Sequence, residues 1–299
     1  MKTNTCLKTN DLTRLKNAVA LLENPGFVSS VTNALSRPAE SAFNLMSGRY
    51  FEMIHEAVPA ALNIALKVAV KSLNKDSRGK PSNRMHKSLS VISGTLGGAF
   101  GTIALPLELS VSTTIMLRTI ADIARSEGEP LESLDSRLAC IQVLAFGGKC
   151  ENGCDGENSY YYVRAMLARA VSEASAYIAE KGMIEEGAPA LVRLITQIAS
   201  RFGITVSEKF AAQAIPGIGA VAGASVNLLF VTHFQNIAKG HFTVRRLERI
   251  YGEDAVRVHY MKFAKRYGAK ISPNGSFPHS TAKISPSGSF PHSTENFYG

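Results

Sequence analysis

Tryptophan is absent from this 299-residue chain, and cysteine occurs only four times, at positions 6, 140, 150 and 154. The first seventeen residues contain no apolar stretch of the kind that forms the centre of a secretory signal peptide. Cysteines in a chain without an export signal stay reduced in a cytosol. We therefore expect a cytoplasmic protein without disulfide bonds.

Long runs of one charge are also missing. The net charge is +9, yet no window holds five or six consecutive basic residues, and no zinc-finger, RNP or KH signature occurs. Such a charge without these features does not indicate a nucleic-acid partner. An anionic membrane surface would also attract a basic protein. We expect no nucleic acid as partner, and a membrane surface or membrane proteins instead.

Signatures of common enzymes are absent too. The nearest approach to the zinc-protease motif H-E-x-x-H begins at His55, but Pro59 stands where the second histidine belongs. No G-x-S-x-G elbow and no phosphate-binding G-x-x-x-x-G-K-[ST] loop occurs. Cys150 and Cys154 have a metal-like spacing, but only Cys140 and a distant histidine would complete a site. We therefore expect neither a metal nor a cofactor.

Apolar residues recur mainly at helical spacing, and alternation typical of strands is absent except at 204–206. The pattern predicts an all-α fold: a single multi-helix bundle with two central glycine-rich apolar helices and a disordered C-terminal tail. Nine helical segments are expected, over residues 11–23, 51–73, 109–127, 133–145, 159–181, 188–202, 204–215, 221–250 and 253–266.

Two apolar segments, 88–107 and 211–232, carry no formal charge and are long enough to cross a bilayer. Both contain glycines four residues apart, a spacing that lets two helix backbones approach closely. Polar residues follow each segment closely, and no tryptophan marks a membrane interface. Two interpretations stay open: central helices of a soluble bundle, or helices inserted in or lying on a membrane.

The C-terminal part repeats itself. AKISPNGSFPHST (269–281) is followed by AKISPSGSFPHST (282–294), a composition that cannot build a packed core. We expect an N-terminal extension over 1–14, a helical domain over 15–266 and a disordered tail over 267–299.

Two sets of polar residues are candidates for chemistry. Glu108 stands at the predicted start of a helix, and Arg118 and Asp122 are spaced for an intrahelical ion pair. Asn227, His233 and His241 belong to one long helix, with Asn227 and His241 on one face and His233 turned away. Glu108 and His233 are weak candidates for a catalytic acid–base pair. The alternative is that all six residues form structural polar contacts.

Basic residues crowd the end of the same long helix. We call Lys239, Arg245, Arg246 and Arg249 the basic collar, and Arg257 follows it. Such a group beside an apolar segment would face an anionic membrane, while cations also suit the C-terminal end of a helix. Both interpretations stay open.

Three segments carry a family resemblance. ALPLELSVSTTIMLRTIADIARSEGE (104–129) has the form LP-x-E-x-x-x-x-T-T-x-M-x-R-x-I-A-x-I-A, and LAFGGK (144–149) followed by YYYVRAMLA (160–168) forms a Gly-Gly then YY-x-x-R block. The third segment is IPGIGAVAGASVNLLFVTHFQNIAKGHFTVRRLERIYG (215–252). In this order they resemble the EcsC protein family, named for the third gene of an ABC-transporter operon.

The resemblance implies no established activity. It favours a membrane-associated accessory or binding protein linked to envelope transport, located in the cytoplasm and peripheral or integral at the inner membrane. Two alternatives remain: a hydrolytic, peptidase-like enzyme using a Glu/His site, and a soluble helical module that binds a lipid or another apolar ligand. The oligomeric state stays open.

Overall fold

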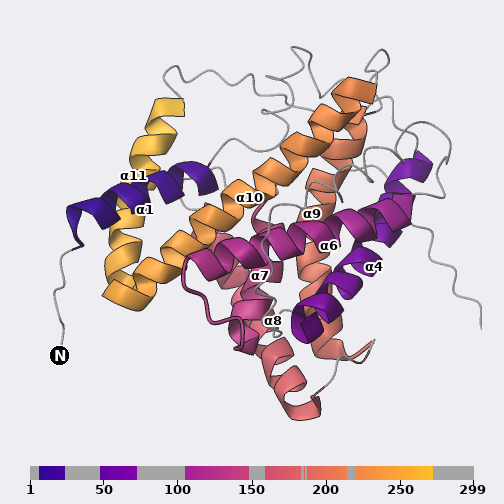
Figure 1. Ribbon diagram of the computed structural model, residues 1–299, viewed down its shortest axis with the longest axis horizontal. Coiled ribbons are helices and arrows are strands. Elements are labelled where there is room, and N and C mark those ends of the chain that lie inside the picture. Colours follow the sequence, from indigo (N-terminus) through magenta and orange to yellow (C-terminus); the bar gives the residue numbers. More distant parts are fainter. Residues whose placement is uncertain are drawn as a thin grey trace, which may run out of the picture.

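The computed structural model describes residues 7–23, 48–72, 105–147, 159–182, 185, 187–213 and 220–271. This part of the chain forms eight helices and no strands, which confirms the predicted all-α class (Figure 1). The helices are α1 (Thr9–Leu22), α4 (Gly48–Ser72), α6 (Leu105–Ser126), α7 (Leu134–Phe146), α8 (Ser159–Lys181), α9 (Pro189–Gln213), α10 (Ala220–Tyr251) and α11 (Glu253–Ile271).

The predicted break near residue 203 is wrong. α9 runs without interruption from Pro189 to Gln213 and includes 204–206, where the sequence alternates as a strand does. Gly203 and three consecutive β-branched residues lower helix propensity there. Packing overrides the local preference, because α9 contacts α4, α7, α8 and α10, and Thr205 and Val206 are completely buried.

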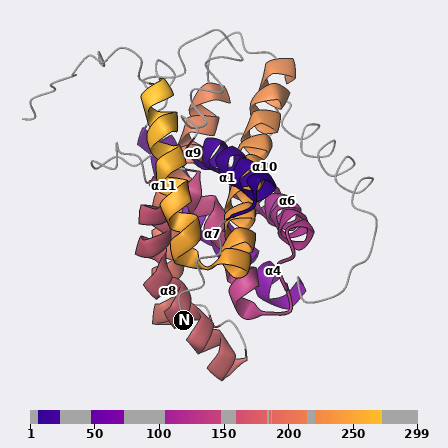
Figure 2. The same cartoon turned by 90° about the vertical axis from the view of Figure 1, so that its left-hand side faces the viewer.

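The 32-residue helix α10 connects the two ends of the molecule (Figures 1 and 2). α1 and α11 pack against its C-terminal half and against each other, while α6, α7 and α9 also contact it. α4 packs most extensively on α6 and also on α9 and α7. The first helix, although it begins in the predicted N-terminal extension, therefore belongs to the packed structure.

α7 is the most completely enclosed helix of the described part. Its residues from Leu138 to Ala145 are all buried, so it lacks the polar face of a surface helix. It begins at a Ser133 cap, whose side-chain oxygen accepts a hydrogen bond from the Ser136 backbone N–H at 3.1 Å. The acidic turn between α6 and α7 is thereby held against the rest of the bundle.

Most of segment 88–107, residues 214–219, Cys150, Cys154 and the C-terminal repeat after Ile271 lie outside the described residues. The predictions made for them stay predictions. α11 ends at Ile271, so the helix extends five residues into the predicted disordered tail over 267–299. Within the described part of the second apolar segment, α10 begins at Ala220, and Val226, Asn227 and Phe230 are buried. Protein therefore covers this face of α10.

Replacement by alanine should have opposite effects on stability at two helical glycines, Gly240 and Gly203. A Cβ on Gly240 would lie 2.7 Å from Leu22 Cγ and 3.1 Å from the Ala18 carbonyl oxygen, where α1 crosses α10. A Cβ on Gly203 meets nothing within 4 Å. We expect Gly240→Ala to lower the free energy of unfolding by about 1–3 kcal/mol through overpacking. Gly203→Ala should raise it by up to about 1 kcal/mol through helix propensity.

Urea denaturation of the two variants and the parent protein measures both changes. Equal effects of the two substitutions would contradict the close crossing of α1 and α10.

Candidate functional site

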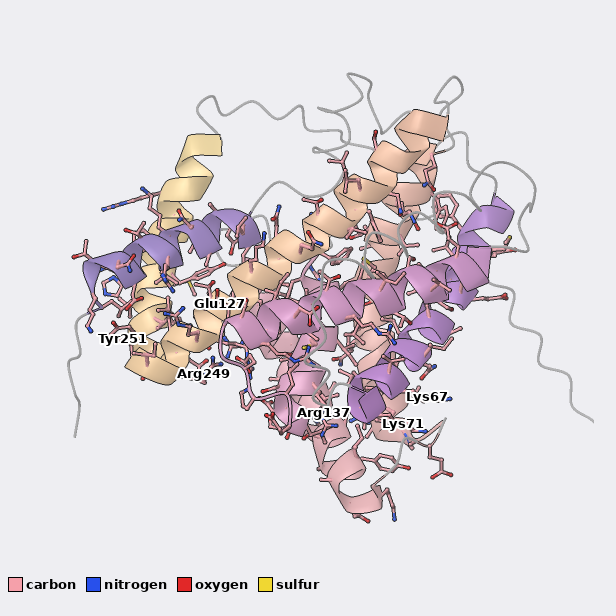
Figure 3. All side chains as sticks on the ribbon, viewed as in Figure 1. Lys67, Lys71, Glu127, Arg137, Arg249 and Tyr251 are labelled. Atoms are coloured by element: carbon pink, nitrogen blue, oxygen red, sulfur yellow. The ribbon has the colours of Figure 1, made fainter. Side chains whose placement is uncertain are left out.

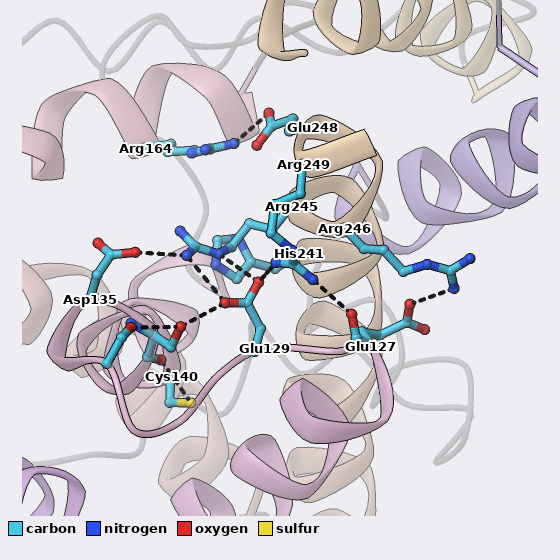
Figure 4. A network of polar contacts seen from close by, with 12 residues as sticks. Glu127, Glu129, Asp135, Cys140, Arg164, His241, Arg245, Arg246, Glu248 and Arg249 are labelled. Carbon is cyan, nitrogen blue, oxygen red and sulfur yellow. Dashed lines mark hydrogen bonds and ion pairs between the residues drawn. The ribbon is translucent and has the colours of Figure 1, made fainter. Parts of the chain in front are cut away.

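The three segments that carry the family resemblance meet in space. Their ends contribute side chains to one network of charges, which we call the polar junction (Figure 4). It lies where the turn between α6 and α7 and the start of α8 contact the C-terminal half of α10. Its members are Glu127, Glu129, Asp135, Arg164, Arg245, Arg246, Glu248 and Arg249.

Glu129 is the most buried carboxylate of the polar junction, with a side chain only 1% exposed. Its oxygens accept hydrogen bonds from Arg245 Nε at 3.0 Å, from the Ser136 hydroxyl at 2.9 Å and from Arg249. Burial opposes ionisation of the carboxyl group, but the bonds and charges of Arg245, Ser136 and Arg249 outweigh it. The pKa of Glu129 therefore lies below its ordinary value, and the group is ionised at neutral pH.

The arginines of the basic collar are paired with carboxylates of the same chain. Arg245 contacts Asp135 at 2.8 Å in addition to Glu129, and Arg246 contacts Glu127 at 3.3 Å. Arg249 also donates to the Glu127 carbonyl oxygen at 2.8 Å, and Figure 3 shows these two residues where α6 ends beside α10. Of the four collar residues, Lys239 alone is exposed without an ion pair among the described residues. This arrangement gives three of the four a role in joining α10 to the acidic turn.

A tyrosine–histidine layer lies next to the polar junction. Arg164 pairs with Glu248 at 2.7 Å, and the Tyr161 hydroxyl donates to the same carboxylate at 3.0 Å. The Tyr160 hydroxyl lies 2.9 Å from His241 Nδ1. Burial, and secondarily the charges of Arg245 and Arg164, lower the pKa of His241 far below its ordinary value. The imidazole is therefore neutral at physiological pH.

A cavity of about 500 Å³ opens between α7, α8 and α10 beside this network. Arg164, Arg245, Asp135 and Gln142 form its polar wall. The rest of the lining comes from α8 and consists of small residues and one valine, namely Ala168, Val171, Ser172, Ser175, Ala176 and Ala179. Guanidinium groups do not release their protons in proteins, so Arg164 and Arg245 can stabilise negative charge but cannot accept a proton.

Glu108 and His233, the weak catalytic candidates, each have another partner. Glu108 lies in the first turn of α6, as predicted, and accepts a hydrogen bond from Lys209 Nζ at 3.0 Å. His233 Nε2 lies 3.1 Å from the Gly147 carbonyl oxygen, and burial lowers the pKa of His233 to about 4. Among the contacts of the described residues, none joins Glu108 to His233.

The predicted ion pair between Arg118 and Asp122 does not form. Asp122 instead pairs with Arg125 at 2.8 Å, three positions further along α6, and Arg118 is exposed. Both spacings bring side chains together on a helix, so the sequence alone could not decide between them.

Asn227 and His241 share the buried face of α10, as predicted from their spacing. In the described part of the chain neither Asn227 Oδ1 nor His241 Nε2 has a hydrogen-bond partner. Asn227 lies one turn from Phe230, whose ring centroid is 5.1 Å from Lys209 Nζ. The two polar residues therefore belong to different surroundings, one near the Glu108–Lys209 pair and one beside Tyr160.

A second, larger cavity of about 860 Å³ lies between α4 and α9, and we call it the α4–α9 groove. Apolar side chains of Ile54, Val58 and Ile204 lie along it, and Gly203 leaves it open. Polar groups also line it, at Glu52, His55, Thr196, Ser200, Ser207 and Glu208. The groove thus combines apolar and polar surface, which suits an amphiphile.

One described helix is long and apolar enough to cross a membrane. This stretch runs from Phe51 to Lys71 in α4, and 44% of it is buried inside the protein. A core helix of a soluble protein passes the same test, so length and composition do not place α4 in a membrane. Among the described residues, no group of three or more His, Cys, Asp or Glu side chains is arranged to hold a metal ion.

The model of the EcsC protein family matches residues 67–247, which is more than half of the chain. The chain belongs to the EcsC protein family. Searches of curated proteins and of solved structures find no match. The EcsC match is narrower than the expected domain over 15–266, and α1 and α11 lie outside it although both pack against α10.

The EcsC region contains most of the polar junction, and one signal in the sequence could have revealed it. The segment from Glu127 to Asp135 carries four carboxylates, and Arg245, Arg246 and Arg249 carry the opposite charge on α10. Complementary charge in two distant segments favours their contact. The burial of Glu129 and the position of Arg164 could be known only from the packing.

Proposed function

We propose that this EcsC-family protein is a membrane-associated binding protein that takes one acyl chain of a membrane phospholipid into the α4–α9 groove. The observation that carries the proposal is the groove itself, about 860 Å³ in volume and bounded on one side by α4. Its volume is within the range of about 300–1,000 Å³ that is usual for small-molecule sites.

The chemistry of the groove supports an amphiphile. Ile54 and Val58 are buried beneath it, whereas Glu52 and His55 on the same helix are exposed. An acyl chain would gain free energy by leaving water for the apolar part of the wall. The polar part would remain in contact with water and a lipid head group.

Basic side chains at one end of α4 supply an attraction to anionic lipid. Figure 3 shows Lys67, Lys71 and Arg137 together near the C-terminal end of this helix. Arg137 is held there by donating a hydrogen bond to the Val70 carbonyl oxygen. Each basic residue near an anionic surface contributes about 1 kcal/mol to binding. We therefore assign the attraction to an anionic membrane to Lys67, Lys71 and Arg137, whereas the sequence alone had suggested the basic collar for this role.

Co-sedimentation with phospholipid vesicles tests the proposal. We expect the protein to bind vesicles of phosphatidylglycerol more tightly than vesicles of phosphatidylcholine. The double variant Lys67→Gln/Lys71→Gln should weaken binding to the anionic vesicles by about tenfold or more. Lys239→Gln, which changes one exposed cation of the basic collar, is the matched control and should bind as the parent protein does.

A second pair of variants tests the groove separately from charge. Gly203→Leu places a side chain in the open space of the groove, and Gly203→Ala is its control. We expect the leucine variant alone to lose binding of a fluorescent fatty acid. Full recovery of the protein in the soluble fraction with both kinds of vesicle would refute the proposal, as would unchanged fatty-acid binding by Gly203→Leu.

A further inference from the structure

The cavity beside the polar junction is rich in hydrogen-bond donors that the protein leaves unused. Arg164 bonds Tyr160 and Glu248 through Nη1 only, so that its Nε and Nη2 have no partner among the described residues. Arg245 bonds Glu129 and Asp135 through Nε and Nη2, so that its Nη1 also has no partner among the described residues. Each guanidinium is therefore held in place by carboxylates and still has N–H groups to offer.

Gln142 contributes a side-chain amide to the same cavity. This α7 residue lines the cavity, and its amide bonds no described residue. Its amide atoms are not among the enclosed side-chain atoms that lack a partner in the described part of the chain, so they are accessible from the cavity. The amide N–H groups can therefore bond a ligand there.

The α8 wall adds hydroxyl groups and room. Ser172 and Ser175 line the cavity, and their hydroxyls make no hydrogen bond within the described part of the chain. The side chains of the alanines at 168, 176 and 179 are short and fill little of the cavity.

From this convergence of donors we infer that the cavity between α7, α8 and α10 binds a phosphate group, carried by a small phosphomonoester or by a lipid head group. Arginine forks and hydroxyls match the several acceptor oxygens of a phosphate. Two arginines and one carboxylate, Asp135, line the cavity, whereas Glu129 and Glu248, which pair with the same arginines, are not part of its lining. The groups that face the cavity therefore favour an anion. The site is separate from the α4–α9 groove and does not depend on it.

Isothermal titration calorimetry of the full-length protein with inorganic phosphate and with glycerol 3-phosphate tests the inference. We expect saturable binding of both, with the phosphomonoester at least as tight. Ala176→Glu puts a carboxylate on an exposed position of the cavity wall, and we expect it to weaken binding by about tenfold or more. Ala176→Gln has nearly the same size without the charge and should bind within about twofold of the parent protein.

A further variant tests the amide itself. Gln142→Leu removes a polar group that has no protein partner, so the fold should tolerate it, while phosphate binding should fall by about three- to tenfold. Vesicles containing phosphatidic acid, compared with phosphatidylcholine vesicles, distinguish the two sources of the phosphate. Competition by phosphatidic acid vesicles identifies a lipid head group, and its absence identifies a free phosphomonoester.

Two results would overturn the inference: no saturable binding of either phosphate compound, or equal binding by Ala176→Glu and Ala176→Gln. The proposed lipid binding is judged by other variants. Lys67→Gln/Lys71→Gln and Gly203→Leu should leave the affinity for glycerol 3-phosphate unchanged.

Discussion

Replacing Glu108 by glutamine should lower the free energy of unfolding by about 3–5 kcal/mol, because it removes the partner of a buried charge. The Lys209 side chain is 0% exposed, and its ammonium group lies 3.0 Å from Glu108 Oε1. The ring centroids of Phe210 and Phe230 lie 5.2 Å and 5.1 Å from Lys209 Nζ. The two rings can attract the cation but cannot neutralise it. Urea denaturation measures the loss.

The double variant Glu108→Gln/Lys209→Met is the control for this prediction. It removes both charges, and replacement of a buried ion pair by uncharged residues is often close to neutral. We expect it to recover most of the stability lost in Glu108→Gln. If the effects of the two single substitutions simply add in the double variant, the two residues do not form a coupled pair.

Glu129→Gln should lower the free energy of unfolding by about 2–4 kcal/mol at neutral pH, because Arg245 and Arg249 both lose their most buried partner. The expected loss is smaller than for an isolated pair because Arg245 keeps Asp135 and Arg249 keeps the Glu127 carbonyl oxygen. Hydrogen–deuterium exchange should rise mainly in the turn from Glu127 to Ser133 and in the facing part of α10.

The same substitution should change how stability depends on pH. The pKa of Glu129 is lower in the folded protein than its ordinary value of 4.5. Its contribution is therefore complete above the unfolded pKa and is lost as the pH falls through the folded pKa. As the pH falls below about 5, near the unfolded pKa, the parent protein should lose more stability than Glu129→Gln. Parallel pH profiles would contradict this assignment.

Much of the helical framework could be predicted from periodicity and from glycine and proline positions. The expected helix over 159–181 coincides with α8, and 221–250 differs from α10 by one residue at each end. α9 was wrongly divided because Gly203 and the β-branched residues after it lower helix propensity locally. Contacts with four other helices restore the helix, and such contacts are invisible in a local pattern.

The candidate site was predictable only in part. The block containing Tyr160, Tyr161 and Arg164 carries part of the family resemblance, and the arginines of α10 form a basic group that is visible in the sequence. Their orientation toward Glu248 and Glu129 depends on how α8 and the α6–α7 turn pack against α10. For this reason the sequence left open whether the basic collar faces a membrane or only suits the end of a helix.

The sequence by itself determined the helical class and the family, because apolar periodicity and ordered motifs are properties of short stretches of chain. It also placed Asn227 and His241 on one face of a helix, since 100° per residue decides that without any partner. Tertiary structure alone decided which charges meet. Ion pairs such as Glu108–Lys209 and Glu129–Arg245 join residues more than a hundred positions apart, and their distances depend on the packing of whole helices.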